Sequence, residues 1–294
     1  MNDKTNPDTT RLLAEQFEAH RSHLRAVAYR MLGSVSEADD AVQEGWIRLS
    51  RTDTSDVNNL GGWLTTVVSR VCLDALRSRR ARREEPQDER LPDPIVSTDS
   101  ATDPEHEAML ADAVGLAMLV VLDTLPPAER LAFVLHDMFA VPFTDIAPIV
   151  GRSTDATKMM ASRARKRVQG SGTVPDADLS RQREVVDAFL AAARQGDFEA
   201  LVAVLDPDVV LRADEVAGLR VVRGATAVAS GAILFSKLSP AEQLVVVNGT
   251  PGVVASRDGE VFSVAAFTVV NDRIVEIDIV GDPDRLRALR ITTP

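Results

Sequence analysis

The 294-residue chain has a single cysteine, Cys72, and only one tyrosine and two tryptophans. One cysteine excludes a disulfide framework and a cysteine-rich metal site, and this usage is typical of a reducing cytoplasm. No apolar run approaches the roughly 20 residues that cross a bilayer. The first ten residues are polar and lack the apolar core of a signal peptide. The sequence therefore predicts a cytoplasmic protein with no membrane partner.

Positive charge is also scarce, since 33 Lys and Arg face 44 Asp and Glu, for a formal net charge of −11. Two basic clusters stand out against this background. One is "RSRRARR", residues 77–83, and the other is residues 152–168, with six basic residues and one acid. Localised basic patches in an acidic chain indicate contact with a polyanion at defined places. The structural alternative is that basic residues near helix C-termini favour the helix dipole.

Hydrophobic periodicity divides the chain into helical and β-rich parts. Two helical segments come first, and from residue 181 two helices precede runs of strand-forming residues punctuated by Gly, Asn and Asp, which predicts a separate α+β domain. The predicted boundaries are residues 1–10 for a disordered tail, 11–83 for the first helical domain, 84–106 for an acidic Pro-rich linker, 107–169 for the second helical domain, 170–180 for a second linker, and 181–294 for the α+β domain.

The second basic cluster lies in a predicted helix-turn-helix. Gly151 turns the chain between two short helical patterns, and Ser153 can cap the second helix. In that helix Thr157, Met160, Ala161, Ala164 and Val168 fall on one stripe, which we expect to be buried. Helical bundles also contain the Ala-x-x-x-Gly spacing of Ala147 and Gly151, and Met159 and Met160 could simply belong to a core.

In a helix-turn-helix, the second helix enters the major groove and its N-terminal residues meet base edges. Residues further along suit backbone phosphates. The resulting DNA-binding candidates are Arg152, Thr154, Asp155 and Lys158 for base edges, Ser162 on the exposed face, and Arg163, Arg165, Lys166 and Arg167 for phosphates.

Two stretches resemble a known family. "LPPAERLAFVLHDMFAVPFTDIAPIVGRSTDATKMMASRARKRV" resembles region 4 of bacterial extracytoplasmic-function (ECF) sigma factors. "GSVSEADDAVQEGWIRL", followed by "GGWLTTVVSRVCLDALRSRRARR", resembles their region 2. The resemblance implies a specificity subunit whose partners are promoter DNA and core RNA polymerase, through its β′ clamp and β flap. Region 4 would bind the −35 element, and region 2 would bind the clamp and melt the −10 element.

The residues of the first helical domain agree with those roles. An acidic polar helix face suits a basic partner surface, although such a face can also be merely solvated. Melting needs a polar pocket for an extruded base and contacts to single-stranded backbone, which the loop over 52–62 and the following helix can supply. The polymerase-binding candidates are Asp39, Asp40, Gln43 and Glu44, and the −10 candidates are Asn58, Asn59, Arg70, Arg77, Arg79 and Arg80.

The chain departs from the family pattern in its second basic cluster. Thr157 stands where the family usually has an apolar β-branched residue of similar shape. Met159 and Met160 replace more polar or smaller residues, so the base contacts of the family do not carry over directly at these positions.

Residues 181–294 resemble the SnoaL-like branch of the nuclear transport factor 2-like superfamily, which builds a curved antiparallel sheet round a cavity. A sigma factor subgroup with this fused domain shares the phrases "ASRAR", "LRAD" and "GDPDRL". Its interdomain linker phrase appears here as "RLPDP" without a Trp, and its Gly-rich run is replaced by "DEVAG". We expect the domain to modulate the sigma factor, with regulatory contacts at Leu91, Pro92, Asp93, Pro94, Asp282, Pro283 and Asp284.

The C-terminal domain is poor in acid–base residues, because all four histidines precede residue 181. In "RIVEIDIV", Glu276 and Asp278 share one strand face, which either lines a cavity as a base or, as we favour, is the wet face of an antiparallel strand. Asp282 is predicted to cap a last helix that begins at Pro283. We therefore predict no enzyme, cofactor, metal or catalytic residue.

The predicted fold class is multidomain: two all-α sigma domains, the second with a helix-turn-helix, followed by an α+β SnoaL-like domain with a curved antiparallel sheet. Two functional alternatives stay open. The C-terminal domain could sense a small-molecule ligand or retain residual enzymatic activity. The whole chain could also be a helix-turn-helix transcription regulator that acts without core polymerase.

Overall fold

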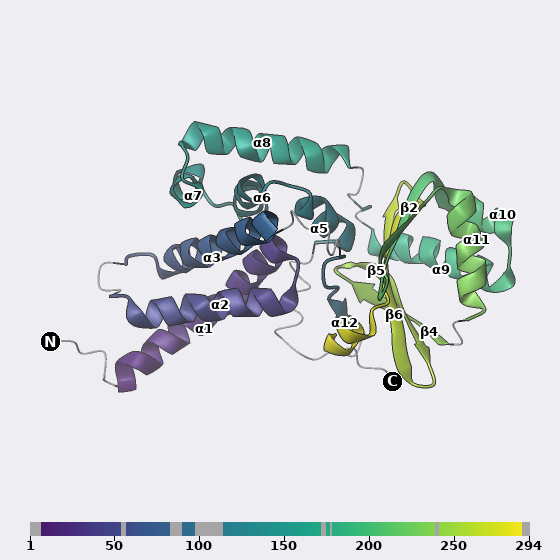
Figure 1. Ribbon diagram of the computed structural model, residues 1–294, viewed down its shortest axis with the longest axis horizontal. Helices are drawn as coiled ribbons and strands as arrows, with labels where there is room; N and C mark the ends of the chain where they lie inside the picture. The colour runs from purple at the N-terminus through teal and green to yellow at the C-terminus, as the bar shows by residue number, and fades with distance from the viewer. Residues whose placement is uncertain are drawn as a thin grey trace. The chain divides into compact units, whose positions relative to one another are not determined.

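The computed structural model describes residues 7–53, 57–82, 90–97, 114–171, 175–176, 178–238 and 241–289 (Figure 1). The chain forms two compact units. The first contains residues 1–86 and 122–167, and the second contains residues 87–121 and 168–294. The predicted fold class is confirmed, with helical domains first and an α+β domain after them.

The first unit begins with three helices, α1 (Pro7–Leu32), α2 (Val35–Arg51) and α3 (Leu60–Arg82). Residues 7–10 of the predicted tail belong to α1, which starts at Pro7, and proline is well suited to a first helical position. Gly33 ends α1 with φ +71°, a conformation that glycine adopts readily. Phe17 of α1 packs against Trp46 of α2 with ring centroids 5.2 Å apart. The apolar stripes of these helices therefore form a shared core.

The second helical segment contains α5 (Leu116–Asp123), α6 (Pro127–Phe133), the π-helix η2 (Val134–Met138), α7 (Phe143–Val150) and α8 (Thr154–Gly170). Pro127 occupies the first turn of α6, where its missing N–H costs nothing. Leu131 of α6, Leu135 of η2 and Ile146 of α7 are fully buried. Within the first unit, α6, η2 and α7 thus pack on one another ahead of α8.

The two helical segments predicted as separate domains share one interior within the first unit. Arg130 of α6 is only 1% exposed and donates from Nε and Nη2 to the carbonyl of Arg30, at 3.1 and 3.0 Å. Its Nη1 donates to Asp123 at 2.9 Å. Phe139 lies under the guanidinium of Arg30, 4.5 Å away, and edge-on to His23. Sequence periodicity did not predict this packing, because it depends on partners about 100 residues apart.

The second unit contains a seven-stranded sheet in the order β1-β4-β5-β6-β7-β2-β3. Neighbouring strands are antiparallel except for β2 and β7, which are parallel, so the expected antiparallel sheet is correct for all pairs but one. The strands are β1 (Val96–Ser97), β2 (Leu205–Glu215), β3 (Gly218–Arg223), β4 (Ala241–Val247), β5 (Thr250–Arg257), β6 (Glu260–Val270) and β7 (Arg273–Val280).

Tight hairpins join β4 to β7 in sequence order. Each two-residue turn has both residues at positive φ, which Asn, Asp and Gly tolerate and the twist of a hairpin requires. The turns are Asn248–Gly249, Asp258–Gly259 and Asn271–Asp272. The Gly, Asn and Asp residues that separate the strand-forming runs in the sequence therefore form these hairpin turns.

Three helices cover one face of the sheet: α9 (Leu179–Gln195), α10 (Phe198–Val204) and α11 (Ala225–Ser236) (Figure 1). Phe189 of α9 meets Phe267 of β6 edge-on, with Ile277 of β7 in the same buried cluster. The sequence did not predict α11, because it is rich in Ala, contains Gly231 and begins at Gly224 without a side-chain cap. A short last helix, α12 (Pro283–Ala288), follows β7.

The linker predicted over 84–106 differs in part from the structure. Residues 90–97 belong to the second unit, where β1 pairs with β4, Val96 facing Val247 and Ser97 facing Val246. Leu91, Ile95 and Val96 are buried. An acidic, Pro-rich stretch carries no periodicity that could reveal a two-residue strand, so this docking was not predictable from the sequence.

Candidate nucleic-acid interface

The helix-turn-helix is built as the sequence predicted. Gly151 has φ +70°, and the backbone N–H groups of Gly151 and Arg152 both donate to the carbonyl of Ala147, at 3.0 and 3.1 Å. The Ser153 hydroxyl accepts from the backbone N–H of Ala156 at 3.2 Å. Both the glycine turn and the serine cap are therefore confirmed.

The buried stripe of α8 is also confirmed for four of its five members. Thr157, Ala161 and Ala164 are fully buried and Val168 is nearly so, whereas Met160 is half-buried. The Thr157 hydroxyl donates to the carbonyl of Ser153 at 2.9 Å. That bond satisfies the polar atom, which explains how threonine fits a position that is usually apolar.

The DNA-binding candidates lie outside this stripe. Lys158 pairs with Asp155 at 3.2 Å on the exposed surface. The exposed members are Arg152, Asp155, Lys158, Ser162, Arg163, Lys166 and Arg167, and the half-buried members are Thr154 and Arg165.

Three of the arginines predicted to meet phosphates are bound to carboxylates of the same unit. Arg163 donates from Nε to Glu129 at 2.8 Å, and Arg167 reaches the other oxygen of Glu129 at 3.3 Å. Arg165 donates from Nε to Asp137 of η2 at 2.7 Å. Arg152 and Lys166 form no ion pair within the residues that the structure describes. The cationic groups that are available without breaking a contact are thus fewer than the sequence indicated.

The acidic face of α2 is at the surface. Asp39, Asp40 and Gln43 are exposed, and Glu44 is half-buried. Asp39 pairs with Arg25 at 2.6 Å, and Glu44 accepts from Arg48 at 2.8 Å within the same helix. All four residues therefore share one polar face, and Asp40 and Gln43 are its members with no charged partner among the described residues.

The loop over 52–62 is described only at its two ends, since residues 54–56 lie outside the described residues. Asn59 precedes α3, and its side-chain oxygen accepts from the backbone N–H of Gly62 at 2.9 Å. This is the geometry of a helix N-cap, so the Asn59 oxygen has a structural role. Asn58 is exposed.

The arginines of α3 divide into two groups. Arg70, Arg77 and Arg80 are exposed, and Arg77 lies 3.8 Å from Asp74. Arg79 is half-buried instead: its Nη1 donates to the carbonyl of Leu32 at 3.0 Å, and its guanidinium also pairs with Glu37. Arg79 therefore fastens α3 to the turn between α1 and α2 and does not join the exposed basic row.

The linker phrase and the C-terminal phrase meet within the second unit. Arg285 of α12 donates to Asp93 at 2.7 Å and also pairs with Asp214 of β2. The backbone N–H of Leu91 donates to Asp214 at 3.1 Å. Pro92 and Pro94 are buried, whereas Pro283 and Asp284 are exposed. We call this group of contacts the linker clasp.

Asp282 has the predicted capping role. Its carboxylate accepts from the backbone N–H groups of Asp284 at 2.9 Å and Arg285 at 3.2 Å. The bond from the Arg285 N–H contributes most, and together these bonds hold the pKa of Asp282 below its usual range. The cap thereby orients α12, which carries Arg285 toward Asp93.

A second part of the linker clasp was not predicted. Asn248, in the turn between β4 and β5, is 1% exposed. It exchanges two hydrogen bonds with Ile95, its N–H to the Ile95 carbonyl at 2.9 Å and its side-chain oxygen from the Ile95 N–H at 2.8 Å. Its side-chain amide donates to the carbonyl of Val114 at 3.2 Å. One side chain thus holds the chain on both sides of residues 98–113.

The preferred interpretation of Glu276 and Asp278 as a wet face is wrong. Glu276 is 7% exposed and Asp278 1% exposed. Arg212 of the parallel neighbour β2 lies between them and donates to Asp278 at 3.0 Å and to Glu276 at 2.9 Å. Burial raises the pKa of Asp278 to about 6. The error arose because the sequence does not show that β2 and β7 are neighbours.

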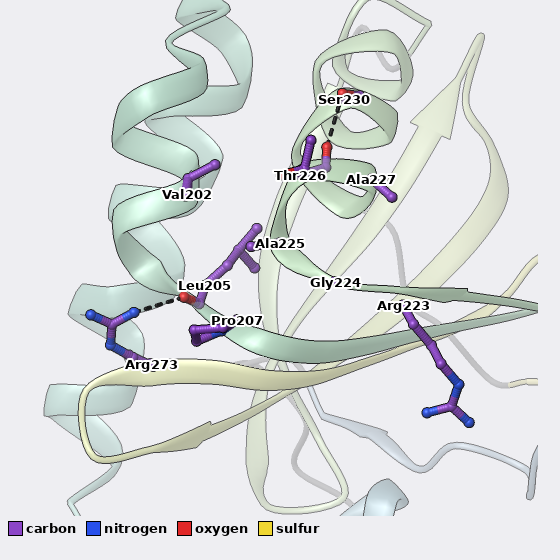
Figure 2. Close-up of a pocket in the computed structure, with 10 residues that line it drawn as sticks. All are labelled: Val202, Leu205, Pro207, Arg223, Gly224, Ala225, Thr226, Ala227, Ser230 and Arg273. Carbon is purple, nitrogen blue, oxygen red and sulfur yellow. Dashed lines mark hydrogen bonds between the residues drawn. The ribbon is translucent and has the colours of Figure 1, made fainter.

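An open depression of about 540 Å³ lies among α10, β2, β3 and α11 (Figure 2). Arg223 and Arg273 lie at opposite ends of its lining, and Arg273 donates to the carbonyl of Leu205 at 3.0 Å. Neither Glu276 nor Asp278 lines it. The buried carboxylate pair therefore has no place in this depression as an acid or base.

The described part of the chain offers neither a metal site nor a membrane-spanning helix. There, no group of three or more His, Cys, Asp or Glu side chains is arranged to hold a metal ion. No helix in the described ranges has the length and apolar content needed to span a membrane.

Comparisons with known proteins agree with this arrangement. Residues 16–82 match the family model of sigma-70 region 2, and residues 116–168 match that of sigma-70 region 4. Over 288 residues, and 92% of each chain, the sequence is 38% identical to the ECF RNA polymerase sigma factor SigJ of Mycobacterium tuberculosis. It is 37% identical to the probable ECF RNA polymerase sigma factor SigI of the same species, over 93% of this chain and 94% of SigI.

The crystal structure of the Mycobacterium tuberculosis extracytoplasmic function sigma factor SigJ is also similar. It matches with a TM-score of 0.77 at 36% identity and covers 95% of this chain and 100% of that chain. The likeness therefore extends through the C-terminal α+β domain as well as the helical regions.

Proposed function

The chain belongs to the family of ECF RNA polymerase sigma factors, and from this premise we propose how its residues share the work of promoter recognition. It directs transcription initiation with RNA polymerase, and its partners are core polymerase and promoter DNA. The observation that carries this function is the joint match of both regions, in order, within a chain that aligns over nine-tenths of its length with sigma factors.

Region 4 is proposed to read the −35 element through α8. Arg152, Thr154, Asp155 and Lys158 stand at the start of the helix, where a recognition helix meets base edges. Ser162 and Lys166 lie on the exposed face beyond them. The three arginines bound to Glu129 and Asp137 reach phosphates after exchanging a carboxylate for a phosphate oxygen, an exchange between two charge-assisted partners.

Region 2 is proposed to hold the polymerase and to melt the −10 element. The exposed acidic face of α2, with Asp39, Asp40, Gln43 and Glu44, suits a basic surface on the β′ clamp, and region 4 would meet the β flap. Asn58 and the exposed arginines Arg70, Arg77 and Arg80 supply contacts to the opened strand. Asn59 and Arg79 have structural contacts, so we assign them a positioning role.

The packing of region 4 on region 2 is proposed to be a closed form. The −10 and −35 elements lie about 25 base pairs apart, which is roughly 80 Å at about 3.4 Å per base pair. Regions joined through Arg130 and the Arg30 carbonyl cannot reach both elements together. Binding to core polymerase would therefore separate the two regions.

The C-terminal domain is proposed to modulate this opening through the linker clasp. The clasp fixes Leu91, Asp93, Ile95 and Val114, all of which lie between regions 2 and 4. A held linker has less freedom than a free chain, so it limits how far the two regions separate. In this role the domain performs no catalytic step, and the whole protein works in the cytoplasm with its polymerase.

The clasp is tested with Asn248→Ala, which removes the side-chain bonds to Ile95 and Val114. The matched control is Asn271→Ala, because Asn271 also has a positive φ in a hairpin turn but bonds through its N–H to Asp176. We expect transcript yield per bound polymerase to change with Asn248→Ala and with a truncation before residue 281, and to stay constant with Asn271→Ala. Equal yields from all four proteins would refute the modulating role.

The main test is run-off transcription from genomic fragments by core polymerase with and without the chain. We expect defined start sites that appear only when the chain is present, and thymines near −10 that react with permanganate. Scrambling residues 52–62 to Gly and Ser should leave core binding intact and abolish that reactivity. A chain that binds DNA in the absence of core polymerase, and does not bind core, would instead be a helix-turn-helix regulator.

A further inference from the structure

Met159 is an apolar side chain placed where solvent exposure is costly. Its side chain is 63% exposed, and the other strongly exposed large apolar residue among the described residues of the first unit is Leu12, at 56%. Its neighbour Met160 is half-buried against the stripe of α8. A single exposed apolar side chain is ordinary on a protein surface, so the place of Met159 on α8 has to carry the argument.

The position of Met159 within α8 points to the DNA-facing side. At 100° per residue, it lies opposite the buried stripe of Thr157, Ala161 and Ala164, with Asp155 one turn before it and Ser162 one turn after. It is the sixth residue of α8, within the half of a recognition helix that meets base edges.

The arginines on either side of the exposed face of α8 point away from its centre, where Met159 lies. Arg163 is drawn toward Glu129 at 2.8 Å, and Arg165, on the other flank, is drawn toward Asp137 at 2.7 Å. Lys158 is paired with Asp155. The middle of the exposed face is therefore an apolar thioether bordered by Ser162, with Lys166 two turns along the helix.

The major groove presents one apolar group at its base edges, the 5-methyl of thymine, whereas guanine and adenine present hydrogen-bonding atoms. A methionine cannot donate to those atoms, but its unbranched, polarisable side chain adapts well to a methyl group. We propose that Met159 selects a thymine in the −35 element by packing against its 5-methyl group. The inference rests on the proposed DNA-binding role of α8 and specifies one base, a thymine, that this helix recognises.

The test removes each side of the contact in turn. Holoenzyme is assembled from core polymerase and the full chain, and a promoter from the run-off assay is made with each −35 thymine replaced in turn by deoxyuridine, which lacks only the methyl. For the wild type we expect one replacement to weaken promoter binding about fourfold, the value for burying one methyl-sized group. For Met159→Ala, the same replacement should have no effect, and thymine DNA should already bind about fourfold more weakly.

Three controls separate the outcomes. Leu12→Ala removes the other strongly exposed large apolar side chain of the described first unit and should keep the wild-type uracil profile. Lys166→Ala should lower the salt dependence of binding at every promoter; an unchanged salt dependence with Lys166→Ala and Arg152→Ala would mean that α8 does not face DNA and the proposed function of region 4 fails. If Lys166→Ala behaves as expected but the wild type and Met159→Ala share one uracil profile, only the role of Met159 is overturned. Weaker holoenzyme assembly with Met159→Ala before DNA is added would assign the side chain to a polymerase surface and also refute the inference.

Discussion

The two units bury an arginine in opposite surroundings. In the first unit Arg130 donates to a backbone carbonyl of α1 and to one carboxylate, Asp123, and burial lowers its pKa although Asp123 opposes the shift. In the second unit Arg212 lies between two buried carboxylates, Glu276 and Asp278. Arg130 thus has one carboxylate beside a buried guanidinium, whereas Arg212 has two buried carboxylates for one positive charge.

This difference teaches which contact is able to separate. In the proposed opening, Arg130 would keep Asp123, which lies in its own segment, and the carbonyl of Arg30 would return to water. No charge is left buried without a partner, so the separation carries no penalty for a stranded charge. When Arg212 is lost, two carboxylates stay buried without their cation, which is costly. The first contact suits a joint that opens and the second suits a fixed support for the linker clasp.

The largest effect is expected from Arg212→Ala. Stranding Glu276 and Asp278 should lower the free energy of unfolding of the second unit by about 3 to 5 kcal/mol at pH 7. Arg220→Ala removes an exposed pair with Glu215 on the neighbouring strand and should cost less than about 1 kcal/mol. Hydrogen exchange of β7 peptides in urea measures both variants within the full chain. Similar decreases in the free energy of unfolding for the two variants would mean that the buried carboxylates of the second unit do not depend on Arg212.

A pH dependence of about 3 kcal/mol is expected from Asp278, because one pH unit between two separated pKa values is worth about 1.4 kcal/mol. The pKa of Asp278 is about 6 in the folded chain against the usual 3.8, so between these values the folded state binds more protons than the unfolded state. Stability through this group is therefore greatest at low pH and falls as the pH rises through about 4 to 6. Comparing the wild type with Asp278→Asn from about pH 3.5 to 7 isolates the effect, and a constant difference across that range would contradict it.

Arg130→Met should open the first unit by about 2 kcal/mol, which is roughly a thirtyfold change in the ratio of closed to open forms. Methionine keeps the apolar stem and loses the bonds to the Arg30 carbonyl and Asp123. Dyes on cysteines introduced at the exposed residues Ser50 and Thr144 report the distance between regions 2 and 4. Arg21→Met, which breaks only a pair with Glu18 within α1, is the control and should leave that distance unchanged.

The smallest expected effect distinguishes two neighbouring cations of α8. Lys166→Ala should reduce the slope of log affinity against log salt by about 0.9, the value for one phosphate contact. Arg167→Ala should reduce it by less, because the side chain must first leave Glu129. Binding of holoenzyme to the −35 element over a range of salt concentrations measures both slopes. A larger change for Arg167 than for Lys166 would contradict a cost for exchanging Glu129 for a phosphate.

The parts of the fold that depend on local pattern could be predicted from the sequence. Gly151, Ser153 and the stripe of Thr157, Ala161 and Ala164 define the helix-turn-helix within about 15 residues, and the caps and hairpin turns follow from Asn, Asp and Gly. Features that depend on distant partners could not be predicted in this way. Glu129 binds arginines 34 and 38 residues away, and the place of Glu276 and Asp278 depends on a neighbouring strand more than 60 residues earlier.

The same limit applies to the candidate site. The sequence placed the basic residues of α3 and α8 on helices, but it counted Arg79 with the exposed arginines although Arg79 bonds to the Leu32 carbonyl. It also gave no sign that Asn248 would hold Ile95 and Val114. An asparagine before a glycine predicts a turn, whatever the turn goes on to contact.

The most direct test of the closed form is the distance between dyes at Ser50 and Thr144 in the otherwise unchanged chain, alone and then bound to core polymerase and promoter. Cys72 can remain in place, because burial raises the pKa of its thiol to about 12 and so keeps it unreactive toward the dyes. We predict a short distance in the free protein and a large increase, toward the roughly 80 Å that separates the two promoter elements, in the complex. An unchanged distance in a transcribing complex would contradict the closed form and the joint at Arg130.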